Sequence, residues 1–276
     1  MSADFTRSEL ADMLHFYALA GLDHALSDAP IDQFAAHALL KSDTRPAPIA
    51  AREAAPVIIR PLPQAASRPA AIPDDAAISA AKSLAASCTS LSALFEALRG
   101  FDGCGLKFTA KNLVFTDGNP QAPVMFITDA PGREDDLEGR LCAGQTGMLL
   151  DRMLASIGLD RRNVYLGAVI PWRPPGNRPP TAFEVEVCRP FILRHIELAA
   201  PRFLVFLGEL PARTLIGSTE SILRLRGQWR DCPQPDGRVI PALSLMPPAY
   251  LIKQPGQKRL AWADLLSLKQ RLRQAG

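Results

Sequence analysis

The sequence contains no long apolar run. No stretch of about 18 uncharged apolar residues occurs in its 276 residues, so we expect no membrane span. The first residues include Asp4, Arg7 and Glu9 and lack the apolar segment that marks a secretory signal peptide. We therefore expect a protein of the cytoplasm.

Cysteine is scarce and irregularly spaced. An odd number of cysteines argues against a disulfide framework in a cytosolic protein of this size. The five are Cys88, Cys104, Cys142, Cys188 and Cys232. The charge of the chain does not identify its partner. A net charge of +3 and a pI near 8.7 are compatible with binding to nucleic acid, but many proteins that bind no nucleic acid are equally basic.

The N-terminal part differs in composition from the rest of the chain. Within residues 6–41, Leu10, Met13 and Leu14 recur at steps of three and four, which predicts helix. Residues 46–73 are rich in proline and alanine and cannot bury enough apolar surface to offset the cost of ordering. We predict a helical segment (1–45), a linker (46–75) and a domain (76–276). Whether the helical segment binds an unknown protein partner or DNA, or only aids solubility, stays open.

From Asp74 onward, helical and strand patterns alternate. Val124–Thr128 is wholly apolar without alternation, which is typical of a parallel strand buried on both faces. The four predicted strands are Val124–Thr128, Asn163–Ile170, Arg202–Leu207 and Val239–Leu245. This order predicts an α/β fold, a three-layer α/β/α sandwich around a short four-stranded parallel sheet. In such sheets ligands bind outside the carboxyl ends of the strands.

Unusual residues follow the first two strands. Asp129 follows the first strand directly and would face the cleft, or it would be a capping carboxylate, which is the commoner role. After the second strand comes a rigid, basic loop with Arg173, Gly176, Asn177 and Arg178. Guanidinium and backbone N–H groups of this kind bind phosphate. The alternative is a structural loop that closes onto the helix capped by Thr181.

The fourth strand leads into a segment with apolar and basic residues. Tyr250, Leu251 and Lys253 could form an apolar wedge with a cationic flank, which enters a DNA groove and supports an unstacked base. A hydrophobic loop that packs on the core is an equally weighted alternative.

The order of these motifs resembles that of type-4 uracil-DNA glycosylases. That family has the strings G-E-A-P-G-x-x-E-D, G-R-P-F-V-G-x-x-G-x-L-L, N-V-x-x-C-R-P-P-G-N-R and H-P-A-Y-L-L. The corresponding segments here are Thr128–Asp136, Gly139–Leu150, Ala168–Arg178 and Pro247–Ile252. The resemblance covers most of residues 104–270 and keeps its register throughout.

The resemblance implies base excision repair, in which the N-glycosidic bond of a flipped DNA base is hydrolysed. It places the catalytic carboxylate at Asp129, where the family has Glu. The base pocket would comprise Ala130, Pro131, Gly132, Cys142, Ala168 and Pro247. Cys142 stands where the family has a Phe that stacks on the base, and Ala168 where it has an Asn that reads the edge of the base. Pro247 stands where the family has a His that stabilises the departing anion. We expect an activity that is reduced or redirected to another lesion, or a catalytically inactive protein that binds DNA as a monomer.

The resemblance also implies an iron–sulfur cluster with four cysteine ligands. Cys104 and Cys188 occupy the second and fourth ligand positions, whereas Phe101 and Trp172 fall on the first and third. Because a four-iron cluster normally takes four thiolates, we expect no metal and no cofactor.

Overall fold

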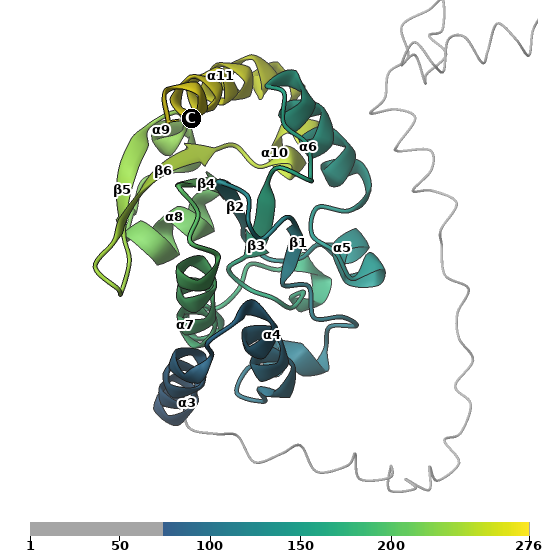
Figure 1. Ribbon diagram of the computed structural model, residues 1–276. Helices are drawn as coiled ribbons and strands as arrows, with labels where there is room; N and C mark the ends of the chain where they lie inside the picture. Colours follow the sequence, from purple (N-terminus) through teal and green to yellow (C-terminus); the bar gives the residue numbers. More distant parts are fainter. Residues whose placement is uncertain (1–73, 276) are drawn as a thin grey trace, which may run out of the picture. The chain divides into compact units, whose positions relative to one another are not determined.

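The computed structural model describes residues 74–275 (Figure 1). The predicted helical segment 1–45 and the linker residues 46–73 lie outside the described residues. The domain that begins near residue 76 is therefore the part whose fold is given below.

The central sheet has six strands in the order β1-β3-β2-β4-β6-β5. The four predicted strands are present as parallel neighbours, β2 (Val124–Thr128), β3 (Tyr165–Ala168), β4 (Phe203–Leu207) and β6 (Val239–Leu245). The predicted count of four was wrong, because β1 (Thr116–Gly118) and β5 (Trp229–Pro233) pair antiparallel at the two edges. Neither edge strand has the apolar run that marks the inner strands, because β1 has only three residues and β5 contains Arg230 and Asp231.

Helices cover both faces of the sheet, which confirms the three-layer sandwich. Figure 1 shows α3, α4 and α7 on one side and α6, α10 and α11 on the other. The helices are α3 (Asp74–Ser87), α4 (Leu91–Gly100), α5 (Arg133–Glu138), α6 (Gly144–Ser156), α7 (Ala182–Ala199), α8 (Glu209–Ile216), α9 (Ile222–Leu225), α10 (Pro248–Lys253) and α11 (Lys258–Ala275). Short 3-10 turns lie at η1 (Gly105–Phe108), η2 (Pro175–Asn177) and η3 (Pro255–Gln257).

The core lies between these layers and fixes where the strands end. Every residue of β4 is buried, as are the first four of β2, so both strands are covered on both faces. The predicted capping box of α7 is confirmed, since Thr181 Oγ1 accepts from Glu184 N at 3.2 Å and Glu184 Oε2 accepts from Thr181 N at 2.8 Å. The cap starts α7 directly after the loop that follows β3.

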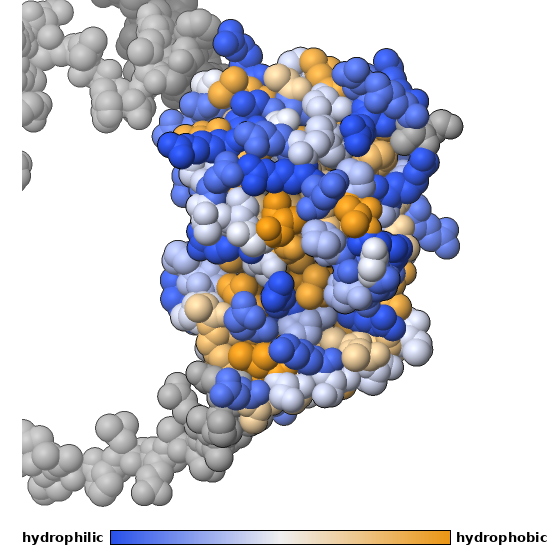
Figure 2. Space-filling model, turned by 90° about the vertical axis from the view of Figure 1, so that its left-hand side faces the viewer, coloured by the Kyte–Doolittle hydropathy of each residue, from blue (hydrophilic) through white to orange (hydrophobic). Residues whose placement is uncertain are grey.

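The surface is mixed in character. Figure 2 shows the face on the left of Figure 1, where apolar patches are small and interrupted by hydrophilic side chains. Such scattered apolar exposure is normal for a folded domain. No helix among residues 74–275 is both long enough and apolar enough to cross a membrane.

Candidate functional site

The carboxyl ends of the four parallel strands meet at one edge of the sheet, as predicted. Thr128 at the end of β2 pairs with Ala168 of β3 on one side and with Leu207 of β4 on the other. Leu207 pairs in turn with Leu245 of β6. The loops that begin at residues 129, 169, 208 and 246 therefore lie next to one another.

Asp129 stands at the centre of this edge. Its backbone carbonyl accepts a hydrogen bond from Ile170 N at 3.0 Å, which joins the loops after β2 and β3. Its carboxyl group lies over Gly208, where a Cβ atom would come within 2.8 Å of Oδ1. Gly208 also has φ +124°, a conformation that side chains rarely adopt. Glycine is thus required at this position for two reasons.

The environment of Asp129 favours its neutral form. The pKa of Asp129 is raised from 3.8 to about 7, chiefly by burial and to a smaller extent by the negative charge of Glu209. The N–H of Leu210 and the charge of Arg213 act in the opposite direction. Although the residue as a whole is half-buried, Oδ1 is buried and accepts no hydrogen bond. At neutral pH about half of the molecules would carry the proton.

Asp129 also lies beside the start of α8. Leu210 is in the first turn of this helix, and its N–H favours the ionised carboxyl. The residue that precedes the helix, Gly208, has no side chain to cap it. The position of Asp129 is therefore compatible with both predicted roles, a group at the strand tip and a cap.

Glu209 was not predicted as a site residue. It is the first residue of α8, and its Oε1 accepts a hydrogen bond from Ile222 N at 2.8 Å. The sequence feature that could have identified it is its place directly after Gly208, the glycine that follows a buried strand. Two carboxyl groups thus lie close together at this edge.

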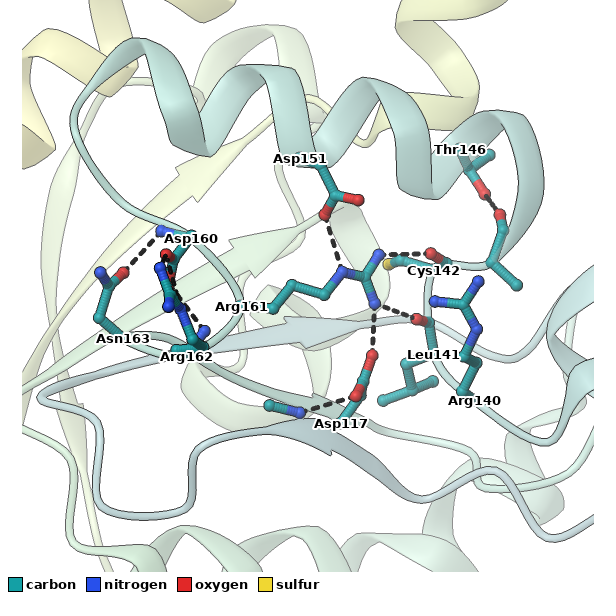
Figure 3. Close-up of polar contacts among 12 residues, drawn as sticks. Asp117, Arg140, Leu141, Cys142, Thr146, Asp151, Asp160, Arg161, Arg162 and Asn163 are labelled. Atoms are coloured by element: carbon teal, nitrogen blue, oxygen red, sulfur yellow. Dashed lines mark hydrogen bonds and ion pairs between the residues drawn. The ribbon is translucent and has the colours of Figure 1, made fainter.

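Cys142 belongs to a loop held by one arginine. Arg161 Nη2 donates to the Cys142 carbonyl at 2.6 Å and Nη1 donates to the Leu141 carbonyl at 3.0 Å (Figure 3). The same guanidinium pairs with Asp151 at 2.7 Å and with Asp117. Cys142 has φ +50°, which is strained for a residue with a side chain, so this contact set holds the loop in an unfavourable conformation.

The side chain of Cys142 offers little chemistry. Burial raises the pKa of the Cys142 thiol to about 12, so it stays protonated and is not a nucleophile at neutral pH. It also lacks the aromatic face on which a base stacks, a contact worth about 1–3 kcal/mol. The side chain of Cys142 therefore affects the size of the site and not its chemistry.

The rest of the predicted base pocket is mostly apolar. Asp135 ties its two loops together, because Oδ2 accepts from Gly132 N at 2.9 Å and Oδ1 accepts from Ala143 N at 2.6 Å. The side chains that would line the pocket have no donor or acceptor: Ala130 is half-buried, Pro131 and Ala168 are buried, and Pro247 is half-buried before α10. The structure brings these residues to the same edge as Asp129 without a group that reads the edge of a base.

The arginines of the loop after β3 are paired within the protein. Arg178 makes a bidentate ion pair with Glu184, at 2.8 and 2.6 Å. Arg173 Nε donates to Asn177 Oδ1 at 2.7 Å, and its Nη1 lies 4.0 Å from Asp136 Oδ2. A phosphate would have to share these guanidinium groups. Gly176 and Asn177 are exposed, with φ +65° and +54°.

One predicted DNA contact requires correction. Leu251 is only 1% exposed and is part of the core, so it cannot form a wedge in this conformation. The helix α10 turns the neighbouring Ile252, 36% exposed, toward the surface instead. Tyr250 is half-buried and Lys253 is exposed.

The positions that the resemblance assigns to cluster ligands include two packed aromatic side chains. Phe101 stacks edge-on against Phe191 with ring centroids 5.1 Å apart, and Trp172 is 2% exposed. The ring of Phe101 also fills the space beside Gly103 that a Cβ would occupy. Cys104 and Cys188 are buried, and the hydrogen bond between them lowers the pKa of Cys104 and raises that of Cys188.

Two thiols and two aromatic rings do not fit a four-iron cluster, which takes four thiolates. Within residues 74–275 there is no group of three or more histidine, cysteine or acidic side chains that could hold a metal ion.

Comparison with known proteins identifies the family of the chain. A sequence model of the uracil DNA glycosylase superfamily matches residues 115–266. A type-4 uracil-DNA glycosylase of Archaeoglobus fulgidus is 36% identical over 156 residues, which cover 55% of this chain and 78% of the relative. Another, of Thermotoga maritima, is 32% identical over 184 residues, covering 66% of this chain and 94% of the relative. The chain therefore belongs to the type-4 family of the uracil-DNA glycosylase superfamily.

Proposed function

We propose that the protein acts on DNA in base excision repair, by hydrolysing the N-glycosidic bond of a flipped base. The observation that carries this proposal is Asp129, a carboxyl group at the meeting point of the four strand ends. Its family and the named activity of its relatives give the reaction class. The predicted cytoplasmic location stays a prediction.

In this reaction the bond between the sugar C1′ and the base nitrogen breaks, and the base leaves with the electron pair. Water adds to C1′ and loses a proton. The ionised Asp129 accepts that proton and stabilises the positive charge on the sugar ring. No side chain of Met246, Pro247 or Pro248 can donate to the departing base, and losing one such donor typically lowers the rate about 100–1000-fold. The protein is a slow enzyme on uracil, or acts on a different base.

The side chains that would line the base pocket determine which damaged base the protein accepts. Ala168 cannot distinguish uracil from cytosine, since it has no group for either edge. Because the side chains of Cys142, Ala168 and Pro247 are small and largely apolar, we expect a preference for a larger or more apolar lesion. No cofactor takes part in this proposal, because the family's cluster does not fit the residues present.

A second candidate is DNA binding without chemistry. The observation that favours it is that Cys142, Ala168 and Pro247 together offer no side chain to stack on a base, read its edge or stabilise the departing anion. Contacts to DNA would then come from Gly176, Asn177, Tyr250 and Lys253 with the shared Arg173 and Arg178.

Base release from uracil-containing single- and double-stranded oligonucleotides tests the first proposal, with alkali revealing abasic sites. We expect slow release that falls at least about 100-fold in Asp129→Asn, because the amide cannot accept a proton. Asp236→Asn, an exposed carboxylate that bonds to Arg238 in the β5–β6 turn, is the matched control. Unchanged release by Asp129→Asn would contradict the assigned role.

An absence of release from every lesion, with salt-dependent DNA binding that weakens in Arg173→Ala or Asn177→Ala, would support the second candidate. Neither release nor binding would refute both.

A further inference from the structure

An apolar groove runs between α6 and α11, which lie together with α10 in Figure 1. We call it the α6–α11 groove. Its larger hollow encloses about 280 Å³ and is lined by Leu149, Met153 and Trp262 among others. A second hollow of about 190 Å³ adjoins it, shares Leu149 with it and is also lined by Met148 and Ile252. Each hollow has room for a large apolar side chain, since a cavity of about 150 Å³ holds a benzene ring.

Apolar exposure is concentrated at this groove. Eight large apolar side chains are exposed among residues 74–275, and four of them lie on these helices: Met148 at 59%, Ile252 at 36%, Trp262 at 42% and Leu266 at 43%. The first three line the hollows, and Leu266 lies one turn after Trp262 on the same face of α11. A contiguous apolar patch of this kind on a folded domain marks an interaction surface. The groove therefore favours an occupant with apolar side chains.

The rim of the groove is positively charged. Arg152 and Lys258 line both hollows, are exposed and have no carboxylate partner among residues 74–275. The helices α6, α10 and α11 together contain seven basic residues and two acidic ones. Both acidic residues are already paired, Asp151 with Arg161 and Asp264 with an arginine that follows α9. An occupant that complements this rim therefore carries negative charge beside its apolar side chains.

The walls of the groove fit a peptide better than a nucleic acid. Apart from Gln145 and Ser156, the uncharged side chains that line the two hollows are all apolar. Trp262 is the one aromatic ring among them, so successive bases would have a single plane on which to stack. Hollows with aliphatic walls accept the side chains of a peptide, which fill them without leaving polar groups unpaired.

The charge of the rim also disfavours a second copy of the chain as the occupant. In a symmetric dimer the same surface meets itself, so Arg152 and Lys258 of the two copies would lie together. No carboxylate of α6, α10 or α11 is free to offset this repulsion, because Asp151 and Asp264 are paired within the chain.

We propose that the α6–α11 groove binds an acidic peptide segment of a partner protein. Two large apolar side chains of that segment enter the two hollows, and its carboxylates face Arg152 and Lys258. The buried apolar side chains provide most of the affinity, whereas the charges at the rim favour acidic partners and speed association. This proposal does not depend on the proposed catalytic function, because Asp129 takes no part in it.

Selection from a displayed library of random peptides tests this proposal, with the full-length protein as the target. We expect the retained sequences to contain pairs of large apolar residues. We also expect them to contain at least about twice as many acidic residues as the starting library, because the rim of the groove attracts carboxylates.

Fluorescence anisotropy with the most enriched peptide then locates the binding site. Met148→Glu places a carboxylate at the second hollow and Arg152→Glu reverses the charge of the rim, so each should weaken binding at least about tenfold. The matched controls are Leu223→Glu and Arg224→Glu on α9, which lines neither hollow. Leu223 is 54% exposed and Arg224 is also exposed, and these controls should change the affinity less than about twofold. All four side chains are exposed, so the variants keep the core, which circular dichroism checks.

Retained sequences without a surplus of acidic residues would overturn the proposal, as would peptide affinity that Met148→Glu and Arg152→Glu leave unchanged. If Met148→Glu weakened binding to a single-stranded oligonucleotide as much as binding to the peptide, the groove would be a DNA surface instead. A dimer of the parent protein in analytical ultracentrifugation that dissociates in Met148→Glu would assign the groove to self-association.

Discussion

At the scale of single residues, the site depends on a close approach between Asp129 and Gly208. The carboxyl of Asp129 lies where a side chain at position 208 would be, so any residue larger than glycine there must displace it. This arrangement places Asp129 against α8, and it explains both the burial of Oδ1 and the raised pKa of the carboxyl.

Replacing Gly208 with alanine should therefore be costly. We expect Gly208→Ala to lower the free energy of unfolding by about 1–3 kcal/mol, because φ +124° is strained for alanine and its Cβ meets Oδ1. Urea denaturation measures this loss. Gly256→Ala is the control, since Gly256 has an ordinary φ and no atom within 4 Å of the added Cβ. Equal stability of the two variants would show that the Asp129 side chain moves without cost.

At the scale of elements, the loop between α5 and α6 is attached to the fold by Arg161, which lies five residues after the end of α6. Loss of this guanidinium removes two ion pairs and two bonds to backbone carbonyls together. The strained backbone at Cys142 would then relax, because the contacts that hold it are gone.

We expect Arg161→Met to lower the free energy of unfolding by about 2 kcal/mol and to expose Cys142. Under native conditions, maleimide labelling of Cys142 should be at least tenfold faster than in the parent, where this thiol is buried. Arg162→Met is a close control, because the Arg162 side chain is 92% exposed and pairs only with Asp160 among the described residues. Slow labelling in both variants would contradict the assigned role of Arg161.

The elements that the sequence predicts are those with a strong local pattern. The four inner strands are apolar runs, and α7 begins at a capping box, so each was found. The edge strands β1 and β5 have polar residues and are defined only by pairing with β3 and β6. The outward turn of Ile252 in place of Leu251 was missed, since a helix of six residues is too short for its buried face to be read from periodicity. The contact of Asp129 with α8 joins segments 80 residues apart and has no local signal.

At the scale of the whole molecule, two buried groups give opposite dependences of stability on pH. His195 is fully buried, its Nε2 lies 2.7 Å from Tyr165 Oη, and burial lowers its pKa from 6.5 to about 3. Between about pH 3 and 6.5 the unfolded chain therefore binds a proton there that the fold does not, and stability rises with pH. Asp129 has the opposite sign, because between pH 3.8 and about 7 the fold binds a proton that the unfolded chain has lost.

In the shared window, from about pH 4 to 6.5, these two contributions offset each other. A variant that lacks one of the two groups should show the contribution of the other. We expect its free energy of unfolding to change with pH by about 1.4 kcal/mol per pH unit relative to the parent. Asp129→Asn should lose stability as pH falls through this window, because only His195 then titrates. His195→Gln should gain stability over the same change.

Urea titrations at pH 4.5, 5.5 and 6.5 measure these slopes, and comparison with the parent cancels the groups that all three proteins share. Parallel pH curves for the parent and both variants would show that neither side chain titrates as its burial implies.

The packed rings of Phe101 and Trp172 have a consequence for substitutions in this part of the interior. Phe101 rests edge-on against Phe191, and both Phe101 and Trp172 are buried. Cutting either ring back to a small side chain would leave a cavity that the surrounding core closes only in part.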